Sequence, residues 1–244
     1  MNETILTVNS LTKLYKNGRG IKNITFNVQK GDVVGLLGPN GSGKTTTMKI
    51  ILGLSNADSG SFEVFGMSSD ENYEQIMART GGLIEAPAIY DYLSAEDNLR
   101  LAARFYQNVD KARIDRVLET VRLDKYKKDK AGQFSLGMRQ RLGLALALLS
   151  EPEFIVLDEP ANGLDIEGMV EIREIITALA QKGTTFLISS HLSAEIEKTC
   201  NKVAVIHEGE LVSFCTMEQA LEYNPSLEDY FLGVVKEKRG AVVI

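Results

Sequence analysis

The sequence predicts an α/β fold with a mostly parallel sheet, an antiparallel β-subdomain near the N-terminus and an inserted helical subdomain. Three observations support this prediction. An apolar run at 32–37 leads into a glycine-rich loop and then a helix. A second apolar run, at 154–157, ends in two acidic residues. Between these runs, the stretch 94–150 has helical spacing of its apolar residues and no strand signal.

The composition is that of an ordinary folded protein. Its 244 residues are 44% hydrophobic and 25% charged, which fits one large α/β domain or a core with a subdomain. The net charge of -6 disfavours a general nucleic-acid-coating role. Cys200 and Cys215 form no metal-binding spacing and fit a reducing compartment.

Nothing in the sequence indicates a targeting or membrane-spanning segment. The N-terminus lacks a basic region, so we expect no signal peptide. The longest strongly apolar stretch, 142–149, is far shorter than a membrane span of about 20 residues. If the protein works at a membrane, a partner is expected to carry the spans.

Hydrophobic periodicity and turn residues locate the individual elements. Asn17-Gly18 is a hairpin-type turn signal, and Ser94 with Asp97 three positions on resembles a capping box at a helix start. Strands are expected at 5–8, 21–28, 32–37, 61–65, 81–85, 154–157, 184–189, 203–206 and 210–214. Helices are expected at 46–52, 72–79, 136–150, 167–181 and 193–198, with a short helix and a loose end after Pro225.

These elements divide the chain into a core, an insertion and a tail. Residues 1–86 and 151–224 are expected to form the α/β core, which includes the antiparallel β-subdomain. Residues 87–150 are expected to form the inserted helical subdomain. Residues 225–244 are the C-terminal tail.

The clearest chemical motif is a phosphate-binding loop. The pattern G-x-x-x-x-G-K-[ST] is matched at every fixed position by Gly38-Pro39-Asn40-Gly41-Ser42-Gly43-Lys44-Thr45. Its glycines let backbone N–H groups form a nest for an anion, and the helix that opens at Thr46 adds partial positive charge. Lys44 brings a full charge to the β- and γ-phosphates, and Thr45 offers a hydroxyl to Mg²⁺. The flanking strand and helix argue against the alternative, a glycine-rich turn with a surface lysine.

A second motif places acidic residues at the end of the strand 154–157. That strand puts Asp158 at the carboxyl edge of the sheet, beside the phosphate loop, where it can hold Mg²⁺ directly or through water. Glu159 can orient and deprotonate an attacking water. His191 follows the next predicted strand, and its position at the same edge favours a phosphate contact over a purely structural role. No role is assigned to His207.

In order and spacing, these motifs resemble the nucleotide-binding subunit of an ATP-binding cassette (ABC) transporter, a P-loop NTPase, over about residues 5–215. Tyr15 matches the aromatic residue that stacks on adenine. The other matches are Walker A at 38–45, the signature motif at 134–141, Walker B at 154–159, the D-loop at 161–165 and the switch histidine at His191.

Two departures from the family pattern stand out. The signature usually reads L-S-G-G-Q, and here Leu136 and Met138 replace a Gly and the Gln. Ser135 and Gly137 remain, and Ser135 can still cap its helix and face a phosphate. Glu85 stands where the family has the glutamine of its Gln loop, and it could bind metal or water there. Both departures resemble the ATPase branch that serves exporters of bacitracin, lantibiotics and similar antimicrobial peptides.

The resemblance implies an ATPase, with ATP and Mg²⁺ as cofactors, that drives an integral membrane permease at the cytoplasmic face of the cell membrane. It implies a homodimer or heterodimer of such subunits, in which Ser135 and Gly137 complete the site of the opposite subunit. No nucleic-acid partner is expected. The resemblance assigns catalysis to Glu159, His191 and Lys44, and metal binding to Thr45, Asp158 and Glu85.

The transported molecule, the direction of transport and the identity of the second ATPase stay open. Three alternatives remain beside the export of an antimicrobial peptide. The chain could be a soluble ABC-type ATPase that acts on ribosomes or DNA. It could be a regulatory module that has lost hydrolysis, or an ABC exporter with another cargo.

Overall fold

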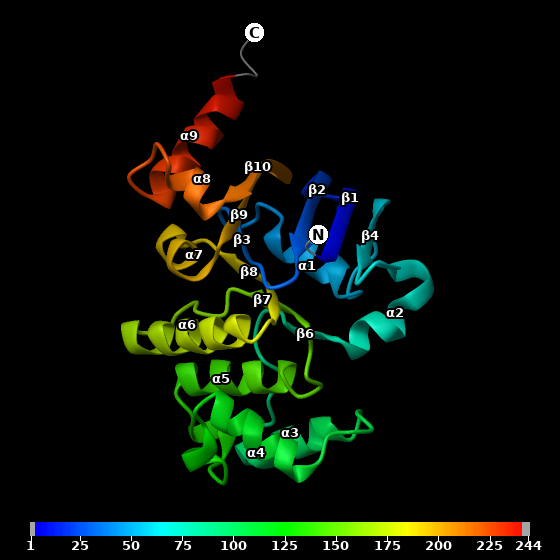
Figure 1. Ribbon diagram of the computed structural model, residues 1–244, viewed down its shortest axis with the longest axis vertical. Coiled ribbons are helices and arrows are strands. Elements are labelled where there is room, and N and C mark those ends of the chain that lie inside the picture. The colour runs from blue at the N-terminus through cyan, green and yellow to red at the C-terminus, as the bar shows by residue number, and fades with distance from the viewer. Residues whose placement is uncertain (1–2, 241–244) are drawn as a thin grey trace.

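The computed structural model describes residues 3–240. Its larger sheet has six strands in the order β10-β9-β3-β8-β7-β6 (Figure 1). Neighbouring strands are parallel except for the antiparallel pair β9 and β10. The strands are β3 (Val33–Leu37), β6 (Thr80–Leu83), β7 (Phe154–Asp158), β8 (Thr185–Ser190), β9 (Lys202–His207) and β10 (Glu210–Thr216).

The N-terminal segments form a second, antiparallel sheet in the order β2-β1-β4-β5. Its strands are β1 (Thr4–Leu14), β2 (Gly20–Gln29), β4 (Ser59–Val64) and β5 (Met67–Ser68). The predicted turn at Asn17-Gly18 lies in the loop between β1 and β2, and Gly18 has a φ of 76°. The predicted α/β fold with an antiparallel β-subdomain is therefore confirmed.

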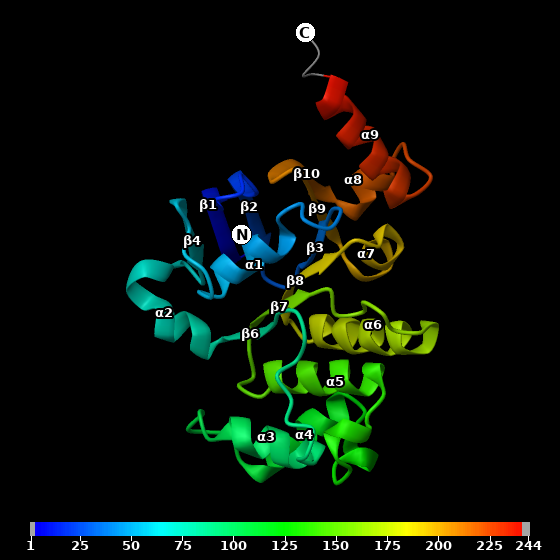
Figure 2. The same cartoon turned by 180° about the vertical axis from the view of Figure 1, so that it is seen from behind.

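The helices lie around and beyond the larger sheet. Figure 1 shows α3, α4 and α5 gathered at one end of the molecule and α9 at the other, and Figure 2 shows the same arrangement from behind. The helices are α1 (Lys44–Ile51), α2 (Ser69–Ala78), α3 (Ala95–Ala103), α4 (Lys111–Thr120), α5 (Leu136–Ala147), α6 (Ile166–Gln181), α7 (Ser193–Thr199), α8 (Met217–Leu221) and α9 (Leu227–Gly240). Short 3₁₀ turns occur at Asp124–Tyr126 and Ala131–Gln133.

The larger sheet is buried on both faces, which explains why its central strands are continuous apolar runs. On β7, Phe154 and Val156 pack into a hydrophobic cluster with α1 and the antiparallel sheet. Their neighbours Ile155 and Leu157 pack into the opposite cluster, which includes residues of α3 to α7. Burial of these alternating side chains holds the carboxyl ends of β3, β7 and β8 at one edge.

Several predicted element boundaries are wrong. The helix expected at 136–150 ends at Ala147, and the helix after Pro225 runs for 14 residues to Gly240. Leu227 and Val235 of α9 are buried, so tertiary packing extends this helix beyond what local signals indicate. The rest of the expected loose end, 241–244, lies outside the described residues.

The expected capping box at Ser94 is also incomplete. The Ser94 hydroxyl accepts a hydrogen bond from the Asp97 N–H at 3.1 Å, as predicted. The Asp97 carboxylate accepts a hydrogen bond from the Ser94 hydroxyl at 2.6 Å instead of from the backbone, so only half of the reciprocal arrangement is present. Within residues 3–240, no helix combines the length and apolar character needed to cross a membrane.

Candidate active site

The phosphate loop connects β3 to α1, and two of its glycines are required by close packing. A Cβ atom on Gly38 would lie 2.1 Å from the carbonyl oxygen of Ile206. Gly43 has a φ of 113°, and a Cβ there would lie 2.4 Å from Cγ2 of Ile21. Only glycine fits such backbone positions, so the loop can curl tightly against β9 and β2.

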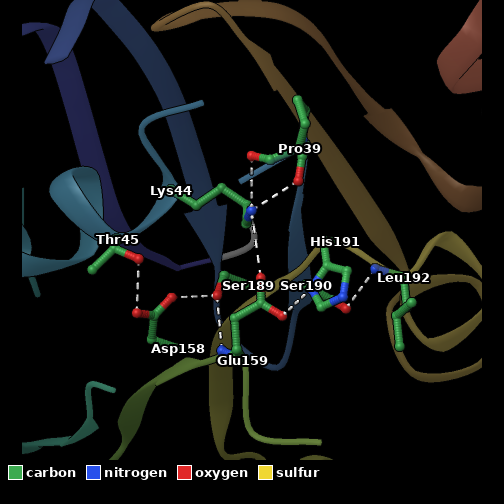
Figure 3. Close-up of polar contacts among 10 residues, drawn as sticks. Pro39, Lys44, Thr45, Asp158, Glu159, Ser189, Ser190, His191 and Leu192 are labelled. Carbon is green, nitrogen blue, oxygen red and sulfur yellow. Dashed lines mark hydrogen bonds and ion pairs between the residues drawn. The ribbon is translucent and has the colours of Figure 1, made fainter. Parts of the chain in front are cut away.

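Lys44, the first residue of α1, turns back into this loop. Its side chain is only 5% exposed. Its Nζ donates hydrogen bonds to the carbonyl oxygens of Gly38 at 2.7 Å and Pro39 at 3.3 Å (Figure 3). The same Nζ lies 3.4 Å from Oε1 of Glu159. The ammonium group therefore lies between the phosphate loop and the acidic end of β7.

Asp158 is held at the end of β7 by two hydroxyl groups. The Thr45 hydroxyl donates to its Oδ2 at 2.8 Å, and the Ser189 hydroxyl donates to its Oδ1 at 2.5 Å (Figure 3). Asp158 and Ser189 are direct partners in the register of β7 and β8. Sequence analysis missed Ser189, although a serine that ends the strand next to Walker B is a usable signal.

The Glu159 carboxylate joins the lysine to the histidine. Its Oε2 lies 2.7 Å from Nδ1 of His191, while its Oε1 faces Lys44. Glu159 has a φ of 51°, which is uncommon for a residue other than glycine. Its N–H donates to the Ser189 hydroxyl at 2.9 Å. Ser189 therefore helps to hold Glu159 in this unusual conformation as well as orienting Asp158.

A cleft of about 320 Å³ opens beside these groups. Tyr15, at 43% exposure, stands at the end of β1 on the wall of this cleft, where its ring can take a stacked base. The lining residues are Tyr15, Asn17, Arg19, Gly20, Asn40, Gly41, Gly43, Lys44, Thr45, Thr46, Glu159 and Asn162. Of these, sequence analysis missed Asn17, Arg19, Gly20 and Asn162. Their positions next to Tyr15 and in the D-loop were the available signals.

The other predicted residues of the loop lie nearby. Gly38, Pro39 and His191 line a neighbouring hollow of about 330 Å³, whose other wall includes residues of α9. Ser42 is buried. Its N–H donates to the Pro39 carbonyl at 3.1 Å, and its carbonyl accepts from the Gly209 N–H at 3.0 Å. The backbone of Ser42 therefore helps to fix the loop's shape.

Ser135 and Gly137 lie at a different cleft. The Ser135 hydroxyl caps α5 by accepting a hydrogen bond from the Met138 N–H at 3.2 Å, as predicted. Both residues line a hollow of about 450 Å³ together with Gly163 and Asp165. This hollow shares no lining residue with the cleft at the phosphate loop. Within one chain, the structure does not bring Ser135 to Lys44.

Glu85 has a partner that sequence analysis did not foresee. Its carboxylate lies 2.6 Å from Nζ of Lys49 on α1, and this hydrogen bond raises the pKa of Lys49. Within residues 3–240, no three His, Cys, Asp or Glu side chains are grouped to hold a metal ion. The role of Glu85 as a metal ligand stays a prediction, and in this structure its carboxylate pairs with Lys49. Thr45 and Asp158 do fit Mg²⁺, because both present hard oxygen atoms at hydrogen-bond distance from each other.

Comparison with known proteins assigns this chain to a family. The family model described as "ABC transporter" matches residues 21–162, more than half of the chain. The chain belongs to the ABC transporter family.

Three similar proteins add detail to this assignment. The bacitracin transport ATP-binding protein BcrA of Bacillus licheniformis is 44% identical over 86% of this chain and 69% of its own length. The lantibiotic transport ATP-binding protein SrtF of Streptococcus pyogenes is 37% identical over 96% of this chain and 100% of its own length. A solved ATP-binding subunit of an ABC transporter has a TM-score of 0.84 and 29% identity, and the match covers 95% of this chain and 100% of that one.

The ABC ATPase interpretation of the sequence is therefore confirmed. The chain is an ATP-binding subunit of the ABC transporter family and an ATPase. The roles of individual site residues stay predictions, to which the contacts described above add physical detail.

Proposed function

We propose that this chain hydrolyses ATP to drive the export of an antimicrobial peptide or a related antibiotic through a membrane permease. Two similar proteins are named for the transport of bacitracin and of a lantibiotic, and these names support the cargo. Leu136, Met138 and Glu85 are departures that resemble the same branch. We place the chain at the cytoplasmic face of the cell membrane, bound to its permease.

The observation that supports the catalytic mechanism best is the contact of both Lys44 and His191 with the Glu159 carboxylate. A γ-phosphate at the loop presents anionic oxygens that compete for the Lys44 ammonium and for the His191 ring. When Lys44 and His191 contact the phosphate instead, the Glu159 carboxylate is released from both. It then accepts a proton from the attacking water. Lys44 stabilises the charge that develops on the transferred phosphoryl group.

Mg²⁺ would be held by Thr45 and Asp158, and when bound it offsets phosphate charge. The Thr45 hydroxyl can turn a lone pair toward a cation while it donates its hydrogen bond to Oδ2 of Asp158, as it does in the structure. Ser189 keeps the other Asp158 oxygen fixed. These residues therefore form an oxygen-rich wall of the site before any ligand enters.

The separation of the two clefts supports a sandwich of two subunits. Lys44 lines one cleft, and Ser135 lines another that shares no residue with it. We propose that Ser135 and Gly137 of one subunit close over the nucleotide held by Lys44 and Tyr15 of the other. ATP then draws the two subunits together, and hydrolysis releases them.

We also propose the domain division predicted from the sequence. Residues 1–86 and 151–224 would form the ATP-binding core, 87–150 the helical subdomain and 225–244 the tail. The grouping of α3, α4 and α5 at one end of the molecule supports the insertion (Figure 1). In this division the helical subdomain passes the motion of the dimer to the permease.

The cargo proposal is tested by co-purification from native membranes. We expect a multi-spanning permease to accompany the chain, and we expect cells with the pair to tolerate more bacitracin or lantibiotic than cells that carry Glu159→Gln. Recovery of ribosomes or DNA without a membrane protein would favour the soluble alternative, which the net charge of -6 disfavours. Recovery of a permease without any gain in tolerance would indicate another cargo.

The shared site is tested by mixing two inactive variants. Lys44→Ala removes the phosphate contact, and Ser135→Arg places a bulky cation where the opposite nucleotide would lie. In a mixed dimer, one of the two sites combines an intact Lys44 with an intact Ser135. We therefore expect the mixture to regain ATPase activity that neither variant has alone. A mixture that exchanges subunits and stays inactive would contradict the two-subunit site.

A further inference from the structure

The short helix α7 begins two residues after His191 and is tied to α6 by an ion pair. Glu195 on α7 and Arg173 on α6 are largely buried, with side chains 15% and 24% exposed. Nη2 of Arg173 donates to both carboxylate oxygens of Glu195 at 3.4 Å. Figures 1 and 2 show α6 and α7 as neighbours. Because α6 follows the turn that begins at Glu159, the pair joins the segment after Glu159 to the segment after His191.

A second anchor of α7 lies on α9. Oε2 of Glu197 accepts a hydrogen bond from the N–H of Leu227 at 2.8 Å. Leu227 is the first residue of α9, where the partial positive charge of the helix N-terminus also favours a carboxylate. Ile196, between the two glutamates of α7, is 1% exposed and packs in the core. A helix of seven residues is not stable by itself, so these contacts fix its position.

A small cavity lies beside the ion pair. Its volume is about 30 Å³, and its lining includes the turn 159–162, Arg173 and Glu195. Nε of Arg173 is buried and has no hydrogen-bond partner within residues 3–240. Side chains that border a void have fewer contacts to hold them in place. At this point the ion pair, more than close packing, therefore sets the distance between α6 and α7.

The two segments that the ion pair joins carry side chains that meet at the candidate active site. Nδ1 of His191 lies 2.7 Å from Oε2 of Glu159. His191 is four residues before Glu195, and Glu159 borders the cavity beside Arg173. A misplacement of reacting groups by about 1 Å can lower a rate by about 10²-fold. A small displacement of α7 would therefore be felt at the contact between His191 and Glu159.

We propose that Arg173 and Glu195 are positioning residues for the contact between Glu159 and His191. They hold α7 against α6, and α7 fixes the backbone from which His191 projects. Neither residue lines the cleft at the phosphate loop, so their effect falls on turnover and not on the binding of ATP. This proposal rests on the catalytic roles proposed above for Glu159 and His191.

Steady-state ATPase kinetics of Arg173→Met and Glu195→Gln test the proposal. In each variant we expect kcat to fall about five- to twentyfold, as for loss of a charged hydrogen bond that is largely buried. KM for ATP should change less than about twofold, because the groups that hold the nucleotide stay in place. Arg173→Lys keeps the charge and should recover part of the turnover. The double variant should lose little more than either single variant, because both remove the same interaction.

The NMR signal of the His191 ring shows whether the loss acts at the site. The chain has two histidines, and the spectrum of His191→Gln identifies the His191 signal by its absence. In Arg173→Met and in Glu195→Gln, this signal should move toward its position in a Glu159→Gln protein, where an amide replaces the carboxylate. The signal of the other histidine should stay where it is.

Arg122→Met is the matched control. It removes another ion pair of α6, Arg122 with Glu174 at 2.7 Å, and Glu174 is the residue next to Arg173. Neither Arg122 nor Glu174 borders the cavity or the cleft at the phosphate loop. The control should leave both kcat and the His191 signal unchanged.

The outcomes separate positioning from a general effect on the fold. Unchanged kcat in both single variants would overturn the proposal, and so would a fall in kcat without any movement of the His191 signal. Glu195→Gln, which keeps the shape of the side chain, carries the test if Arg173→Met does not fold. If Glu159→Gln and His191→Ala kept near-normal turnover, the proposed catalytic roles themselves would fail, whatever the ion pair does.

Discussion

The cleft at the phosphate loop and the cleft at Ser135 differ in how much of each the chain builds by itself. In the first, Lys44 and Asp158 are 5% and 4% exposed, and their polar groups are held by strand ends and loop carbonyls. In the second, Leu136 and Ile166 beside the cleft are 49% and 78% exposed. These two side chains are available for contact with another molecule, as is Tyr15 at the first cleft, which is 43% exposed. The predicted catalytic groups are thus pre-arranged in the core, while the surface around the Ser135 cleft remains open to solvent.

The largest effect on ATP turnover is expected from Glu159→Gln, at the first cleft. The amide cannot accept the proton from water, so turnover should fall by about 10²- to 10⁴-fold. The phosphate loop keeps its hydrogen bonds from Lys44, and the substitution removes the negative charge 3.4 Å from Lys44 Nζ. ATP affinity should therefore be kept or rise, and a closed dimer should accumulate. Phosphate release, equilibrium nucleotide binding and size-exclusion chromatography measure these three quantities.

Glu174→Gln is a suitable control for that substitution. Glu174 is an acid on α6 that pairs with Arg122 at 2.7 Å, and it is not among the residues that line either cleft. Its loss should leave turnover close to that of the wild type. Near-normal turnover in Glu159→Gln would remove Glu159 from the role of general base and would weaken the contrast between the two clefts.

A smaller loss is expected from Ser189→Ala, which acts on the same network indirectly. The substitution removes one donor to the Asp158 carboxylate and the acceptor for the Glu159 N–H. A buried group left without its partner costs about 1–3 kcal/mol, so turnover should fall about tenfold or more. Steady-state kinetics with varied Mg²⁺ measure the loss.

Ser190→Ala offers a comparison at the next position. The Ser190 hydroxyl accepts from the Leu192 N–H at 2.9 Å, and within residues 3–240 it forms no hydrogen bond with Asp158 or Glu159. Its removal should cost less turnover than the removal of the Ser189 hydroxyl. Equal losses would indicate a general disturbance of β8 rather than the loss of support for Asp158 and Glu159.

At the open cleft, Ser135→Ala should mainly weaken association. Loss of the cap on α5 costs about 1 kcal/mol of stability, and the contact proposed with the opposite nucleotide is lost as well. ATP-dependent dimer formation in the Glu159→Gln background should therefore need several-fold more protein, as measured by analytical ultracentrifugation.

Ser226→Ala is the matched control for the cap. The Ser226 hydroxyl accepts from the Asp229 N–H at 3.2 Å at the start of α9, away from Ser135. Its removal should cost similar stability and leave dimer formation unchanged. If both substitutions weaken dimer formation equally, Ser135 acts only as a helix cap.

The sequence predicts the first cleft better than the second because its signals are local. The glycines from Gly38 to Gly43 specify a loop by their own geometry, and the apolar run before Asp158 specifies a buried strand. The role of Ser189 depends on the register between β7 and β8. Local signals do not specify that register, so Ser189 was missed.

The contact between Glu85 and Lys49 likewise depends on the tertiary structure and not on a local sequence signal. The two residues are 36 positions apart, and they meet because of the path that the chain takes after β6. The family pattern favoured metal binding at position 85, whereas the packing of the chain supplies a lysine. The extent of α9 was likewise set by packing, since Leu227 and Val235 are buried about two helical turns apart, and Tyr230, Phe231 and Val234 between them pack against the core.

The smallest effect is expected at the helical end of the molecule, where ion pairs supplement packing. Glu96 in the first turn of α3 is 2% exposed and lies 2.7 Å from Lys128 and 2.5 Å from Arg100. The hydrogen bond from Lys128 lowers the pKa of Glu96, although burial opposes this. Because the pKa of Glu96 is lower in the folded chain, its ionised form stabilises the fold at pH values above the unfolded-state pKa of about 4.3. This contribution is lost as the pH falls through the pKa of the folded state.

Glu96→Gln should therefore lower stability at pH 7 by less than about 1 kcal/mol, since Lys128 and Arg100 are well exposed and screened by solvent. In a chain of this length, that corresponds to a decrease of about 2–4 °C or less in Tm. The difference from the wild type should shrink as pH falls below about 4, because protonated glutamic acid and glutamine are then nearly equivalent. A difference that persists at acid pH would show that packing of Glu96, rather than its charge, stabilises this end of the molecule.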